Sequence, residues 1–187
     1  KLLLIEIYTQ TDSEYANPAE AVKWASELRV EYPNHPMIDF VEIVALYENK
    51  NYDGVITATD EFLEKVKNGE PFYKKIYMFR GLVAKATAYF AKKDWELAKQ
   101  NFLRAVFTMA DSKPPTTNFE GKPNRWAIWA LVRLGQIEDI LGNRNKAVEY
   151  YEKALSYEDH WGLENYIKDY PDDGYDMEEF PGQLPPP

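Results

Sequence analysis

The chain has 187 residues, of which 45% are hydrophobic and 15% aromatic, and its formal net charge is −9. This length suits one domain with a substantial core, and no apolar run approaches the ~20 residues that a membrane-spanning helix needs. Cysteine is absent, which excludes disulfides, thiolate metal ligands and a cysteine nucleophile.

The negative charge is concentrated near the C-terminus. Residues 1–157 carry 22 acidic and 21 basic residues, whereas residues 158–187 carry nine acidic residues and the single base Lys168. Nucleic acid is therefore not an expected partner, because phosphate binding needs a clustered basic surface. We interpret the acidic segment as a solvated extension, with a docking segment for a basic partner as the alternative.

The first 35 residues predict a helical pair. Leu2 to Tyr8 would belong to its first helix, and Asn17 followed by Pro18 is typical of an N-cap and a first helical position. The side chains that share one face of the second helix are Ala21, Ala25 and Leu28.

Residues 36–70 and 71–110 continue the helical periodicity, with Pro and Gly between the periodic segments. In the later segment the small residue Ala86 precedes a helix face made of Trp95, Ala98, Phe102 and Ala105. In the earlier one the bulkier Ile43 and Val55 stand at the corresponding positions, and Phe62 stands where an alanine is expected. These larger residues predict a different distance between its two helices.

Residues 111–125 are rich in Pro, Thr, Asn and Gly and predict an inserted loop. In residues 126–157 Gly135 marks a close approach of two helices, and Gly142 favours a left-handed exit from the first of them. The second helix carries Ala147, Tyr151 and Ala154 on one face, and we expect Tyr151 to fill the space between repeats.

The stretch from Leu131 to Leu155 resembles the tetratricopeptide repeat: a large residue, Leu-Gly, then Ala, an aromatic four residues on, and Ala three after that. The sequence of this stretch looks most like that of functionally unassigned bacterial tetratricopeptide proteins. Ala21 and Val55 are 34 residues apart, which is the period of that repeat.

The resemblance implies an all-α fold, a right-handed superhelical stack of about four antiparallel helix pairs with a capping helix. The pairs would be residues 1–35, 36–70, 71–110 and 126–157. The capping helix and an acidic, proline-rich extension would occupy residues 158–187.

Enzyme chemistry is not expected, and no catalytic residue, metal site or cofactor is assigned. His35 and His160 are the only histidines, and a zinc site would need a third ligand that converges with them. The acidic run from Asp169 fails the calcium-loop pattern, because Pro171 and Phe180 would fall at ligand positions. Phosphate-binding loops and nucleophile elbows do not occur.

In tetratricopeptide arrays the first helix of each pair lines a concave groove, so the resemblance implies a groove with apolar, aromatic and arginine side chains. A chaperone-type carboxylate clamp is not expected, because only Arg133 of its residues is present. The candidate partner-binding residues are Phe40, Val44, Tyr47, Arg80, Val83, Thr87, Phe90, Trp129, Arg133 and Gln136.

Such a surface favours a protein–protein interaction scaffold that binds a partner peptide or helix. The alternative is a structural protein that self-associates as a homo-oligomer through its repeats or its C-terminal segment. An enzyme is the least favoured interpretation. We expect a soluble protein of the bacterial cytoplasm or periplasm, the compartment staying open because a targeting segment before Lys1 would not be part of this sequence.

Overall fold

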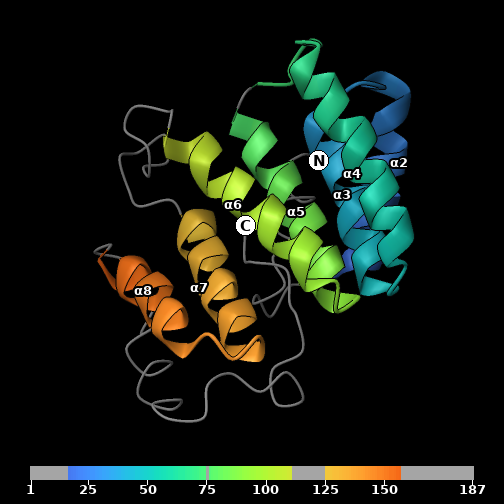
Figure 1. The fold of residues 1–187 in the computed structure, drawn as a ribbon. Helices are drawn as coiled ribbons and strands as arrows, with labels where there is room; N and C mark the ends of the chain where they lie inside the picture. Colours follow the sequence, from blue (N-terminus) through green and yellow to red (C-terminus); the bar gives the residue numbers. More distant parts are fainter. Residues whose placement is uncertain (1–16, 75, 111–124, 157–187) are drawn as a thin grey trace.

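The computed structural model describes residues 17–74, 76–110 and 125–156, and all regular structure within these ranges is helical (Figure 1). The helices are α2 (Pro18–Glu31), α3 (Pro36–Glu48), α4 (Tyr52–Lys67), α5 (Ile76–Ala91), α6 (Trp95–Ala110), α7 (Arg125–Ile140) and α8 (Arg144–Leu155). The predicted all-α helical repeat fold is confirmed. None of the described helices is both long and apolar enough to cross a bilayer.

The N-terminal boundary of α2 agrees with the sequence. The side chain of Asn17 accepts a hydrogen bond from the backbone N–H of Glu20, and Pro18 takes the first helical position. The helix expected before it, the capping helix and residues 111–124 of the expected loop lie outside the described residues.

Three helix pairs, α3–α4, α5–α6 and α7–α8, share one connection of three residues. Its middle residue has a positive φ in every case: 57° at Lys50, 61° at Lys93 and 76° at Gly142. The third residue then donates its N–H to a carbonyl in the last turn of the first helix, as Asn51 does to Leu46 at 2.9 Å. The same turn therefore reverses the chain three times.

Two glycines mark close contacts between helices. A Cβ on Gly135 would lie 2.3 Å from Cε1 of Tyr151, so α7 and α8 approach closely, as the sequence predicted. A Cβ on Gly81 would lie 2.7 Å from Cδ2 of Leu63, so α5 also packs closely against α4 of the preceding pair. The ring of Tyr151 lies within its own pair, whereas we expected it between repeats.

The first helices of the pairs are closer to one another than the second helices are. Cα atoms of α3 and α5, and of α5 and α7, come within 8 Å, whereas the described α4, α6 and α8 do not approach one another in this way. Figure 1 shows the pairs following one another along the stack. We call the side formed by α3, α5 and α7, turned away from the second helices, the inner face.

The core has two parts. The main cluster runs from Phe40 in α3 to Ala154 in α8 and includes the fully buried Ala86, Ala98 and Ala147. A separate small cluster joins α2 to α3 through Ala21, Ala25, Leu28, Ile38 and Val41. The small residues let paired helices approach, and the aromatic residues fill the volume between them.

Candidate partner-binding face

All ten predicted partner-binding residues lie on α3, α5 and α7. Arg80 and Trp129 are partly exposed, and the other eight are buried. Phe40 and Tyr47 contact aromatic rings of the second helix α4, with centroid distances of 6.5 Å to Phe62 and 5.5 Å to Tyr52. The residues thus gather on one side of the stack, but they do not form an apolar groove open to solvent.

Arg133 is the centre of the group that the structure brings together. Its guanidinium lies over the ring of Phe90 at 4.9 Å and over the ring of Trp129 at 4.7 Å. Its Nη1 donates to Oε1 of Gln136 at 2.9 Å. Since Phe90 belongs to α5 and the others to α7, this cation–π cluster joins two pairs across the inner face.

Trp129 also carries a polar atom with nothing to bind among the described residues. Its indole Nε1 is buried and has no hydrogen-bond acceptor there. A buried N–H without an acceptor costs roughly 1–3 kcal/mol. An acceptor placed on this part of the inner face would therefore bind favourably.

A second arginine lies farther along the same face. The Arg80 guanidinium is 6.0 Å from the ring of Tyr77, and its Nη1 donates to the sulfur of Met37 at 3.8 Å. Thr87 of α5 is fully buried, and its hydroxyl donates to the carbonyl of Val83 one turn back. The inner face thus combines two cations with an apolar surface.

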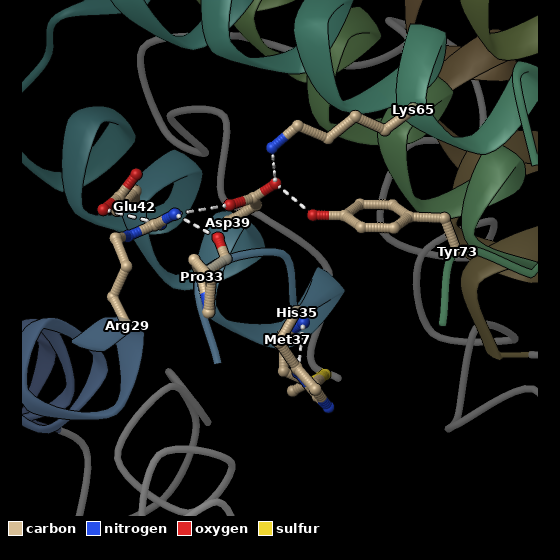
Figure 2. Close-up of polar contacts among 8 residues, drawn as sticks. All are labelled: Arg29, Pro33, His35, Met37, Asp39, Glu42, Lys65 and Tyr73. Atoms are coloured by element: carbon tan, nitrogen blue, oxygen red, sulfur yellow. Dashed lines mark hydrogen bonds and ion pairs between the residues drawn. The ribbon is translucent and has the colours of Figure 1, made fainter. Parts of the chain in front are cut away.

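The sequence did not single out the polar cluster around Asp39 (Figure 2). Oδ1 of this carboxylate accepts from Arg29 of α2 at 3.0 Å. Its Oδ2 accepts from Lys65 of α4 at 2.7 Å and from the hydroxyl of Tyr73, which follows α4, at 2.5 Å. One side chain of α3 therefore holds three neighbouring segments, and Glu42 adds an ion pair to Arg29 at 2.7 Å.

The charges of this cluster shift its pKa values. Burial alone would raise the pKa of Asp39, but the hydrogen bonds from Lys65 and Tyr73 and the nearby cations hold it below the ordinary value. Burial and the Asp39 carboxylate together raise the pKa of Tyr73. Asp39 is therefore ionised and Tyr73 protonated near neutral pH, which suits structural cross-linking rather than proton transfer.

Glu138 forms a second buried cluster between pairs. It is fully buried and lies 2.5 Å from Nζ of Lys99 on α6, with Lys146 at 3.5 Å. Asn143 donates to its other oxygen at 2.9 Å. Burial raises the pKa of Glu138, but the hydrogen bonds from Lys99 and Asn143 and both lysine charges keep it below the ordinary value.

The adjacent Asp139 makes different contacts, as expected for neighbours on a helix. It accepts two hydrogen bonds from Arg144, at 2.8 and 2.9 Å, and one from the Tyr151 hydroxyl at 2.8 Å. His35 caps α3, its Nδ1 accepting from the N–H of Met37 at 3.3 Å. No three metal-ligating side chains converge within the part of the chain that the structure describes.

The tetratricopeptide repeat family model matches residues 130–159. This part of the chain is therefore assigned as a tetratricopeptide repeat. The match covers most of α7 and all of α8, the pair in which Gly135 receives the ring of Tyr151. No curated protein and no solved structure matches the chain. Tetratricopeptide repeats generally mediate protein–protein interactions and are typically not enzymes.

The three helix pairs fill the space between their two helices in different ways. The residue nine positions before the second helix is Ile43, Ala86 or Gly135, and the residue seven positions after that helix begins is Thr59, Phe102 or Tyr151. A large residue at the first position accompanies a small residue at the second. A small residue at the first position accompanies a large residue at the second. The first pair keeps its volume by placing the buried Phe62 one turn later.

Proposed function

We propose that this chain is a protein-binding module whose inner face holds a segment of a partner protein. Its family supports the general role, because tetratricopeptide repeats generally mediate protein–protein interactions. The observation that carries the choice of face is the cluster in which the Arg133 guanidinium contacts the rings of Phe90 and Trp129.

The geometry of this cluster suits recognition. Contacts with two aromatic rings restrain the guanidinium, so little conformational entropy remains to be lost when it binds an oxygen. Tryptophan and arginine are also the residue types that most often dominate binding energy at protein interfaces. The partner segment would offer carboxylate or carbonyl oxygens to Arg133 and Arg80, with apolar side chains between them.

The test is capture of partners from the source organism's lysate by the immobilised chain. Trp129→Ala combined with Arg133→Lys keeps the positive charge but removes the indole and the planar guanidinium. Arg104→Lys is the matched control, because Arg104 is exposed on α6. We expect the control and the unmodified chain to retain the same proteins and the inner-face variant to lose them.

Helical content, measured by circular dichroism, must stay unchanged in both variants, so that lost capture cannot be ascribed to unfolding. Equal capture by the two folded variants would contradict the choice of the inner face. Loss in both variants would contradict it as well, because arginines far from the inner face would then matter equally.

A further inference from the structure

Arg133 is deeply buried although it lies on the inner face. Arg133 is about 160° around α7 from Gly135, the residue that meets α8, so it points away from its own second helix. Its side chain is nevertheless only 3% exposed, and Gln136, to which it donates, is fully buried. The rings of Phe90 and Trp129 cover part of its guanidinium, and a further segment lying over this side of α7 would cover the rest.

We propose that the C-terminal segment, residues 158–187, docks on the inner face of the same molecule and competes there with partner proteins. The charges in the amino-acid sequence favour this segment over the two other parts of the chain that could cover the face. Residues 1–16 carry one base and three acids, residues 111–124 carry two of each, and residues 158–187 carry one base and nine acids. Only the last complements a face that presents Arg80 and Arg133.

The end of this segment also fits the aromatic part of the face. It reads Phe-Pro-Gly-Gln-Leu-Pro-Pro-Pro, and proline-rich segments favour an extended helix that docks on aromatic surfaces. Proline has a carbonyl acceptor but no N–H donor. A carbonyl of this stretch would accept from Nε1 of Trp129, which has no acceptor among the described residues.

The C-terminal segment is long enough to reach the inner face from the end of α8. Thirty residues in an extended conformation span up to about 100 Å, whereas a helix of 16 residues, such as α5, is about 24 Å long. A tethered segment acts at an effective concentration of roughly millimolar. A partner would therefore bind more weakly to the intact chain than to a chain whose segment had been released.

The first test locates the segment in the full-length chain. A photoreactive amino acid replaces Leu184, and cross-linked peptides are identified by mass spectrometry after illumination of dilute protein. We expect intramolecular cross-links to α5 and α7. Cross-links to the outer helices α4, α6 or α8, cross-links between molecules, or none above background would each overturn the proposal.

The second test measures protection of Arg133 in the full-length chain. Modification of arginines by phenylglyoxal is followed residue by residue, with Arg104 as the exposed reference. The comparison is a variant in which Asp172, Asp173, Asp176, Glu178 and Glu179 become the corresponding amides, and its helical content is checked by circular dichroism. We expect Arg133 to react at least tenfold faster in this variant, and Arg104 to react at an unchanged rate.

Equal protection of Arg133 in the two proteins would overturn the docking, whatever the cross-linking shows. The result is independent of partner capture, so the two proposals can fail separately. A chain that passes both tests but captures no partner would contradict the proposed function alone. A chain that captures partners but fails either test would contradict the docking alone.

Discussion

The aromatic ring of Tyr151 occupies the space that a side chain on residue 135 would need. Cε1 of the ring would lie 2.3 Å from a Cβ at Gly135, far inside van der Waals contact. The ring cannot easily move aside, because its hydroxyl donates to Asp139 at 2.8 Å. Glycine at 135 is thus required by volume, and its backbone is ordinary helix.

Gly135→Ala should therefore destabilise the chain by about 1–3 kcal/mol, the usual range for overpacking. Alanine is otherwise the better helix former, so a propensity effect would have the opposite sign. Urea denaturation followed by circular dichroism measures the free energy of unfolding. Tyr151→Thr, which copies Thr59 of the first pair, should cost less in the Gly135→Ala background than alone. A simple sum of the two effects would contradict the volume argument.

The sequence predicted this pair well because its volume is distributed in the way the family repeat prescribes. It predicted the α3–α4 pair less well, since Ile43, Thr59 and Phe62 exchange large and small positions there. Burial of all three shows that the pair still closes. A pattern of residue types fixes where helices meet, but only coordinates show which side of the contact supplies the volume.

Two other features could not be predicted for a different reason. Gly81 contacts Leu63 of the preceding pair, and no spacing within one repeat indicates a contact between repeats. Asp39 gathers partners from three segments, up to 34 residues away in sequence. The inner-face residues were predicted to lie on the right helices, and their role in binding stays a prediction.

Lys93→Gly should stabilise the chain by roughly 0.5–1 kcal/mol, because Lys93 has a φ of 61° in a conformation that costs little only for glycine. The equivalent position in the last pair already has Gly142. The increase in the free energy of unfolding would appear as a higher urea concentration at the midpoint of unfolding. Lys153→Gly is the control, since Lys153 is an exposed residue inside α8. This substitution should lower the free energy of unfolding by a similar amount. A loss of stability at residue 93 would show that the repeated turn is not strained there.

Asp39→Asn should cost roughly 2 kcal/mol, because it weakens hydrogen bonds between charged groups and leaves Arg29 and Lys65 near each other without their shared acid. Glu64→Gln is the matched control, since Glu64 forms only an exposed pair with Lys67 and should change stability by less than about 0.5 kcal/mol. Chemical denaturation at pH 7 compares them. Equal effects would mean that the Asp39 cluster adds nothing beyond a surface ion pair.

Acid should weaken the fold through the same carboxylate. The pKa of Asp39 in the folded chain lies below the ordinary value of 3.8, and that of Glu138 below 4.5. Below those values the unfolded chain binds protons first, so the free energy of unfolding falls with falling pH until the folded groups also protonate. Above about pH 5 both contributions are complete.

The midpoint in urea, measured from pH 6 to pH 3, checks this dependence. The gap between the unmodified chain and Asp39→Asn should narrow as the pH falls, because protonation removes the charge that the variant already lacks. A gap that stays constant over this range would contradict the lowered pKa.

The separate cluster that joins α2 to α3 bears on the order in which the described helices unfold. Its side chains Ala21, Ala25 and Leu28 contribute little apolar area, and they do not merge with the larger core. Repeat arrays lose structure unit by unit when one interface is weaker than the rest. Amide protons of α2 should therefore exchange through opening of that helix alone. Amide protons of α5 should exchange only when the larger core unfolds cooperatively. Such a difference in exchange would place the start of the cooperative unit at α3, beyond the Arg29–Asp39 ion pair that links α2 to it.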